Sequence, residues 1–172
     1  MNETNLATLP HISRVDVENA KIENDEWKFL HVFLEKYFEV IDENPEVLKD
    51  FTLSQLTLLA YFHLNSEVCN GGFIQLIQNG RGSIFDSPFS DFLRKWGVEK
   101  VAEIVDKAKV VYEKYKEELE KEINTAEEFC QLYVDITEFE PLDAQFDEVT
   151  NSETGILKYY VENHLEEFAV IE

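Results

Sequence analysis

The chain has 172 residues, of which 44% are hydrophobic, including 13 Phe, 7 Tyr and 2 Trp. This is enough apolar material for one folded domain, and it excludes a disordered acidic tail. The 36 acidic and 15 basic side chains give a net charge of −21. Such a surface repels nucleic acid and anionic membranes and attracts basic partners.

The small number of turn-forming residues indicates the fold class. Only 6 Gly and 4 Pro occur, which is few for a β-sandwich, so we expect an all-α fold of seven to nine helices. We expect one domain over residues 1–172 and allow for a flexible N-terminus over residues 1–12. No run reaches the roughly 18 apolar residues of a membrane span and the first residues lack the apolar core of a secretion signal, so we expect a cytoplasmic protein. Cys69 and Cys130 lack a metal-type spacing and are predicted to be buried free thiols, with a single disulfide left open.

The first half of the chain contains two long helical patterns. Apolar residues at three- and four-residue spacing predict an amphipathic helix over 16–44, ending at Asn44-Pro45. A second helix over 52–68, with Thr52 as N-cap, is apolar on nearly every side and is predicted to be central. The chain then breaks at Gly71 and Gly72 and restarts, with Phe73, Ile74 and Ile77 facing inward until Asn79-Gly80.

The second half begins with a short helix over 87–97, with Ser87 as N-cap, Pro88 at the first position and Gly97 at the end. A long helix with one apolar stripe is predicted over 98–123. Thr125 and Glu128 form a capping box that starts a helix over 125–140, and Pro141 marks the next boundary. The last helix is predicted to begin at Ser152 and to have the following residues on its inner side: Ile156, Leu157, Tyr160, Val161, Leu165 and Phe168.

The sequence lacks the common motifs for binding metal ions, calcium or phosphate. No His follows a Glu at the spacing of a di-iron or zinc-protease motif. The nearest calcium-loop candidate, Asp147 through Asn151 to Glu153, has Val149 at a ligand position. Gly80-Arg81-Gly82 lacks the third Gly of a phosphate loop. We therefore predict no enzyme activity and assign no catalytic residue, metal ligand or cofactor.

The segment around residues 65–79 places polar side chains among Leu, Phe and Ile. These residues are Asn65, Glu67, Asn70, Gln75, Gln78 and Asn79. The structural interpretation is that they cap helix ends and satisfy backbone groups at a tight corner. The alternative is a small-ligand or enzymatic site at the Glu67–Asn79 corner.

The run EVCNGGFIQLIQNG, residues 67–80, resembles the signature of a bacterial NGGF domain family whose best-known member is a nineteen-kilodalton DNA-mimic protein. The signature residues, interpreted as structural, are Glu67, Asn70, Gly71, Gly72, Phe73, Gln75 and Asn79. The similarity extends through the residues after Gly97, 141–148 and 158–168. The resemblance implies an all-helical homodimer that binds a helix-turn-helix transcriptional regulator and keeps it from its operator.

Charge placement supports the same hypothesis independently. Residues 122–172 contain 14 acidic side chains and one base, Lys158. Carboxylates three or four residues apart on a helix lie about 5–6 Å apart, similar to neighbouring phosphates. A soluble acidic surface, or a generic acidic adaptor for basic nucleoid proteins, stays open as an alternative. The candidate partner-binding carboxylates are Glu113, Glu117, Glu120, Asp135, Glu138, Glu140, Asp143, Asp147, Glu148, Glu162 and Glu166.

Overall fold

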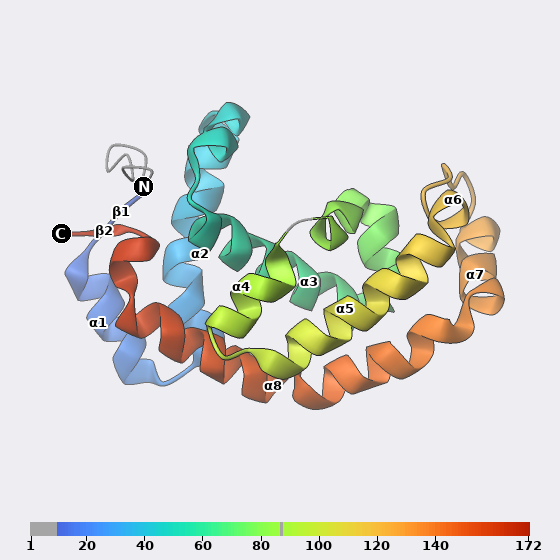
Figure 1. Cartoon of the computed structure of the whole chain (residues 1–172). Coiled ribbons are helices and arrows are strands. Elements are labelled where there is room, and N and C mark those ends of the chain that lie inside the picture. Colours follow the sequence, from blue (N-terminus) through green and yellow to red (C-terminus); the bar gives the residue numbers. More distant parts are fainter. Residues whose placement is uncertain (1–9, 87) are drawn as a thin grey trace. The chain divides into compact units, whose positions relative to one another are not determined.

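The computed structural model describes residues 10–86 and 88–172, and it confirms the all-α fold class (Figure 1). Eight α-helices and two short strands occur in these ranges. None of the helices in this part of the chain is long and apolar enough to cross a membrane. The chain divides into two compact units, unit 1 (Met1–Leu59 with Thr154–Glu172) and unit 2 (Ala60–Glu153). The expectation of one domain over residues 1–172 stays a prediction, and residues 1–9 of the N-terminus lie outside the described ranges.

Unit 1 contains segments from both ends of the chain, and two short strands pair them with each other. Its elements are β1 (His11–Ile12), α1 (Arg14–Glu23), α2 (Glu26–Glu43), the 3-10 helix η1 (Pro45–Asp50), the start of α3 (Leu53–Leu76), the end of α8 (Glu140–Asn163), η5 (Leu165–Glu167) and β2 (Val170–Ile171). The strands were not predicted. They are parallel, with His11 opposite Val170, and lie beside the labelled termini (Figure 1).

The core of unit 1 forms where α2 meets the segment after α8. Phe29, Leu30, Phe33, Leu34 and Tyr37 of α2 are fully buried, as is Phe168. The Tyr37 hydroxyl donates to the Phe168 carbonyl at 2.9 Å. The predicted N-cap role of Thr52 is confirmed, because its Oγ1 accepts from the Gln55 N–H at 3.1 Å. The bond from Tyr37 thus joins α2 to the segment after α8, and the Thr52 cap starts α3.

Three sequence expectations for unit 1 are wrong. The helix over 16–44 is two helices, because Asn24 adopts a left-handed conformation (φ 50°) and Asp25 caps α2 by accepting from the Lys28 N–H at 2.9 Å. The last helix does not begin at Ser152, since α8 is continuous from Glu140. Ile156 is exposed rather than buried.

Unit 2 holds the rest of the helices. They are the remainder of α3, the π-helix η2 (Ile77–Arg81), η3 (Gly82–Phe85), α4 (Phe89–Lys95), α5 (Glu99–Lys114), α6 (Lys116–Leu119), α7 (Ala126–Asp135), η4 (Thr137–Phe139) and the first part of α8. The core stacks aromatic rings. Phe73 contacts Phe85, Phe139 and Phe146, with ring centroids 5.8–6.4 Å apart.

Several helix ends in unit 2 are set by capping residues close to them in the sequence. The Thr125–Glu128 capping box is present and starts α7, as predicted. Gly97 (φ 82°) ends α4, as predicted, with the Val98 N–H donating to the Leu93 carbonyl at 2.9 Å. Pro88 precedes α4 instead of occupying its first position, and Ser87 lies outside the described residues.

Two further expectations for unit 2 are wrong. The helix over 98–123 breaks at Tyr115, where φ is −115°, so α6 is a separate short helix. The helix over 125–140 ends at Asp135. Cys69 and Cys130 are free, as predicted, but both are exposed instead of buried.

The signature residues form the corner inside α3. Gly72 (φ 73°) reverses the backbone, and the Phe73 N–H beyond it donates to Asp143 Oδ1 at 2.9 Å. The Tyr133 hydroxyl donates to the Gly71 carbonyl at 2.6 Å. Residues of α7 and α8 therefore hold the corner through its backbone.

The polar side chains of the corner bond to one another. Glu67 Oε2 accepts from Gln75 Nε2 at 2.7 Å and from Asn79 Nδ2 at 2.8 Å. Asn70 Nδ2 donates to Gln75 Oε1 at 3.1 Å. These groups satisfy one another, as the structural interpretation of the signature expects.

The corner predicts that Gly72→Ala is much more destabilising than Gly80→Ala. Gly80 (φ 78°, ψ 19°) is in the left-handed helical region, where Ala costs about 1–2 kcal/mol of backbone strain. Gly72 (φ 73°, ψ −175°) is in a region that is essentially restricted to Gly, so Ala is more strained there. At Gly72 the added Cβ would also overlap the Asp143 carboxylate, whereas at Gly80 it meets open space. Urea denaturation of both variants measures the difference. Equal losses of unfolding free energy would contradict the proposed close packing.

Candidate partner-binding surface

The acidity of unit 2 is concentrated in its last third. Residues 60–121 carry ten acidic and nine basic side chains, and are nearly neutral. Residues 122–153, here called the acidic segment, carry ten acidic side chains and no Lys or Arg. The segment comprises the connection into α7, α7, η4 and the first part of α8. Its charge cannot be neutralised by bases of its own.

Four carboxylates of the acidic segment are used by the fold. Glu153 is only 2% exposed and accepts from the Lys100 and Val101 N–H groups at 2.9 and 3.4 Å, which caps α5. Glu128 belongs to the capping box of α7. Asp143 bonds the corner, as described above.

The fourth is Glu138, a predicted contact residue. Its Oε1 accepts from Lys114 Nζ at 2.7 Å and from the Tyr115 hydroxyl at 2.6 Å. These two hydrogen bonds hold the pKa of Glu138 well below its usual range, and the bond between Lys114 and Glu138 raises the pKa of Lys114. Its charge is therefore already paired.

The other six carboxylates of the acidic segment point to solvent. They are Glu122, Glu127, Asp135, Glu140, Asp147 and Glu148. No salt bridge within residues 10–86 and 88–172 involves any of them. Asp135 accepts only from the neutral Gln131 amide, at 2.8 Å. These six carboxylates are therefore exposed and have no basic partner in the described residues.

Three of the six lie on α8, and two of them form a row. Glu140 and Asp147 are seven residues apart, which is two helical turns, so they share one face of the helix. Their separation along the axis is about 10 Å, the rise of about three phosphates on one strand of B-DNA. Glu148 follows Asp147 and points about 100° further round the helix, so it lies beside this face and not on it. The row therefore has a spacing that a phosphate-binding surface can meet.

The remaining predicted carboxylates differ in whether they have a hydrogen-bond or ion-pair partner. Glu113 lies 3.9 Å from Lys109 Nζ, and Glu120 accepts from the Tyr112 hydroxyl. Glu117 is exposed. All three belong to unit 2 but precede the acidic segment.

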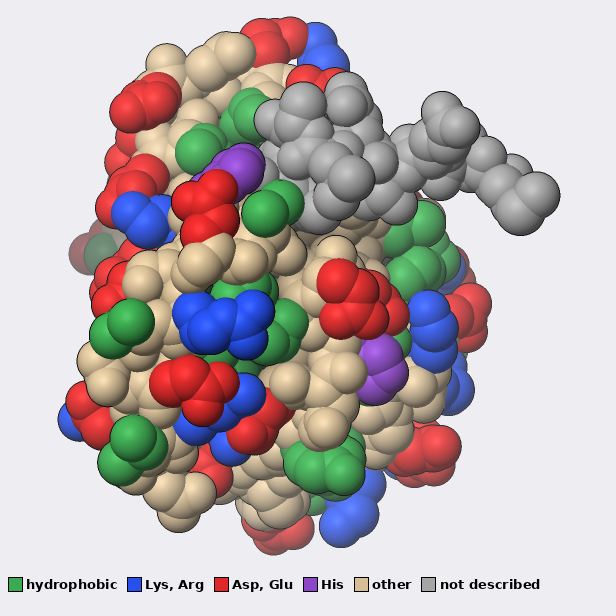
Figure 2. Space-filling model, turned by 90° about the vertical axis from the view of Figure 1, so that its left-hand side faces the viewer, with side chains coloured by type: hydrophobic (Ala, Val, Ile, Leu, Met, Phe, Trp, Pro, Cys, Tyr) green, Lys and Arg blue, Asp and Glu red, His purple; other side chains and the backbone are tan. Residues whose placement is uncertain are grey.

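Two predicted carboxylates belong to unit 1 instead. Glu162 is half-buried and pairs with Lys158 at 2.5 Å, and Glu166 is exposed. Figure 2 shows a face of the molecule on which acidic side chains lie among Lys and Arg side chains. A mixed-charge face of this kind is an ordinary soluble surface, unlike the acidic segment.

Sequence reasoning did not select Glu118, Glu122 or Glu127, all of which are exposed. Glu118 and Glu122 are four residues apart on the helix predicted over 98–123, so the spacing rule applied to them and they should have been selected. Glu127 did not meet the rule, because no acid lies three or four positions from it. Glu122 and Glu127 were visible in the count of acids after residue 121. That count was the better signal.

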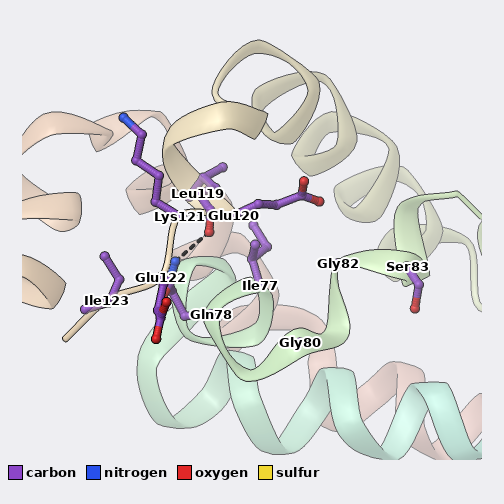
Figure 3. A pocket seen from close by; sticks show the side chains of 10 residues that line it. All are labelled: Ile77, Gln78, Gly80, Gly82, Ser83, Leu119, Glu120, Lys121, Glu122 and Ile123. Atoms are coloured by element: carbon purple, nitrogen blue, oxygen red, sulfur yellow. Dashed lines mark hydrogen bonds between the residues drawn. The ribbon is translucent and has the colours of Figure 1, made fainter.

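A cavity of about 440 Å³ lies beside the corner, between η2–η3 and the residues after α6 (Figure 3). Gln78 Nε2 donates to the Leu119 carbonyl at 2.5 Å across it, so this predicted corner residue bridges two segments. The lining includes Glu120, Glu122 and one hydroxyl, Ser83, but no His or Cys. Lys121 also lines the cavity. No group of three metal-ligating side chains occurs in the described ranges either.

The helical fold, the hydrogen-bonded NGGF corner and the exposed carboxylates define a class of acidic, all-helical proteins. Residues 49–164 match the DMP19-like protein family, and the chain belongs to this family. Over 165 residues it is 32% identical to the DNA mimic protein DMP19 of Neisseria meningitidis serogroup B. The match covers 95% of this chain and 96% of that protein, which confirms the resemblance seen in the signature.

Asp143 predicts a pH dependence of stability. Burial raises its pKa to about 6, and the charges of Asp147 and Glu140 add to the rise, against the hydrogen bond from Phe73. A carboxyl with a raised pKa stabilises the fold when protonated, and this contribution is lost as pH rises from about 4 through about 6. The Asp143→Asn variant can still accept from Phe73 but does not ionise.

We therefore expect the unfolding free energy of the wild type to fall by about 1 kcal/mol relative to Asp143→Asn between pH 4 and pH 7. This figure allows for solvent at the half-buried carboxylate. Urea denaturation of both proteins at each pH gives the difference, and background titration of the other acids cancels. A constant difference would show that Asp143 has an ordinary pKa.

Proposed function

We propose that this protein is a DNA mimic. It binds the DNA-binding face of a bacterial helix-turn-helix transcription factor, blocks operator binding and so modulates transcription. It acts as a non-enzymatic, cytoplasmic homodimer. The observation that carries the proposal is the acidic segment, with six exposed carboxylates and no basic residue to pair with them. Membership of the DMP19-like family, whose Neisseria member is named a DNA mimic protein, supports the same role.

The physical basis is the way DNA-binding proteins hold DNA. Much of their affinity comes from Lys, Arg and helix N-termini that contact phosphates and release counterions. A rigid helix that presents carboxylates at similar spacing meets the same groups. Glu140 and Asp147 do so on α8, with Glu148 exposed beside them, and Asp135 adds a further carboxylate at the end of α7. Binding is then expected to weaken steeply as salt rises.

Like charges on a helix face repel one another, and this repulsion favours a functional reading of the segment. Each such pair costs a few tenths of a kcal/mol when no base lies nearby. Folding alone does not require the six exposed groups, since four other acids of the segment perform the structural tasks. A basic partner would convert this repulsion into attraction.

Partner identity separates mimicry from a generic acidic adaptor. The protein is immobilised and exposed to bacterial lysate at low salt, and bound proteins are released with duplex DNA. Mimicry predicts that DNA releases one helix-turn-helix regulator. Release of many basic proteins in proportion to their abundance would instead indicate an adaptor, and would contradict the proposal.

The acidic segment predicts the effect of neutralising α8. We expect Glu140→Gln/Asp147→Asn/Glu148→Gln to weaken competition with operator DNA about tenfold, because three exposed contacts of about 0.5 kcal/mol each are lost. Electrophoretic mobility shift of the captured regulator on its operator measures this competition.

The matched control is Glu35→Gln/Asp42→Asn/Glu43→Gln on α2 of unit 1. These carboxylates are also exposed and make no salt bridge within the described residues, so the net charge changes equally. We expect less than a twofold effect. If both triple variants lose competition equally, net charge alone drives binding and α8 has no special place in it.

A further inference from the structure

A second hollow of unit 2 lies beside the acidic segment. It has a volume of about 390 Å³ and is formed by α6 with its flanking residues and by one face of α7. We call it the α6–α7 hollow. It exists because α5 ends at Tyr115 and α6 is short, so no helix continues across this face of α7. Its lining residues are Tyr115, Glu118, Lys121, Ile123, Glu128, Gln131, Leu132, Asp135 and Ile136.

The floor of the hollow is apolar. Leu132 and Ile136 are buried, at 8% and 2% exposure, and line it together with the half-buried Ile123. The Tyr115 hydroxyl is bonded to Glu138, so the ring contributes aromatic surface. A side chain with an aliphatic stem would cover this floor and remove apolar surface from water.

The rim of the hollow is acidic. Three carboxylates, Glu118, Glu128 and Asp135, face one ammonium, Lys121. Glu128 accepts from the Asn124 and Thr125 N–H groups at 2.9 and 3.3 Å, and no basic side chain contacts it. None of the three carboxylates makes a salt bridge in the described part of the chain. The rim therefore has an excess of negative charge above an apolar floor.

Asp135 is placed where the fold itself gains nothing from its charge. It is the last residue of α7, and the negative end of a helix dipole disfavours a carboxylate there. The Gln131 amide orients it without neutralising it. A cation entering the hollow would be attracted both by Asp135 and by the helix terminus.

We propose that the α6–α7 hollow is a binding site for a single arginine side chain of the DNA-binding partner. The stem lies on Ile123 and Leu132, and the guanidinium meets Glu118 from α6 and Asp135 from α7. Arginine fits better than lysine because its planar group has five donors, can engage two carboxylates at once and is weakly hydrated. The assignment of the arginine to that partner rests on the proposed function.

The probe for this site is N-acetyl-arginine amide, titrated into the isotope-labelled full-length protein and followed by backbone amide chemical shifts. N-acetyl-lysine amide tests the preference for a guanidinium, and N-acetyl-citrulline amide removes the charge while keeping the shape. We expect shifts confined to residues 115–136, at least fivefold weaker binding of the lysine probe and no saturable binding of citrulline. Shifts spread evenly over all exposed acids, or equal binding of citrulline, would overturn the site.

The variant Glu118→Gln/Asp135→Asn is expected to weaken arginine binding at least fivefold. Glu127→Gln/Glu148→Gln removes the same charge from the acidic segment without touching the hollow, and we expect less than a twofold change. The helix dipole predicts that Asp135→Asn does not destabilise α7, and thermal unfolding checks that both variants are folded. Equal losses in the two variants would overturn the site.

The titration uses no partner protein, so its result does not depend on whether the protein is a DNA mimic. If the arginine probe does not bind but duplex DNA releases a regulator from the immobilised protein, the arginine site is overturned and the proposed function is retained. A positive titration with no such regulator supports an arginine site and overturns its assignment to a DNA-binding partner.

Discussion

The hydrogen bond between the Phe73 N–H and the Asp143 carboxylate is the contact on which unit 2 depends. It satisfies a backbone donor that the reversal at Gly72 would otherwise leave without a helical partner. It also places α8 against the corner, where Phe73 meets Phe139 and Phe146. Tyr133 brings α7 to the same point through the Gly71 carbonyl. The NGGF signature is thus the centre of a junction of three helices, which explains its residue types without a ligand.

This junction also changes how the acidic composition should be understood. Of the ten acids in residues 122–153, Glu128, Glu138, Asp143 and Glu153 have structural partners, and the other six are exposed without an ion pair in the described residues. A count of charges treats these two groups alike. The distinction matters because a carboxylate that accepts a backbone hydrogen bond cannot move to meet a partner, whereas an exposed one can.

The features that could be predicted from sequence are those set by neighbouring residues. The Thr125–Glu128 box, the Thr52 cap and the end of α4 at Gly97 each involve residues within five positions of one another. The break at Asn24 was missed because apolar periodicity continues across it, although Asn followed by Asp is a plausible end and restart.

The roles of Asp143 and Glu153 could not be predicted in the same way. Their partners lie 70 and 53 residues away, and no periodicity records such a distance. Asp143 was consequently grouped with the phosphate-like carboxylates, and its position against Gly72 became visible only in three dimensions.

Exposed carboxylates and the α6–α7 hollow would contribute differently to recognition. A row of solvated charges attracts any basic surface, and its attraction falls with salt because counterions screen it. It raises the rate of encounter more than it selects a partner. A hollow with an apolar floor and an acidic rim imposes a shape as well as a charge, and its apolar contribution persists at high salt. If the acids of α8 bring a regulator to the surface, a directional contact of this kind is what would let one regulator be preferred among many basic proteins.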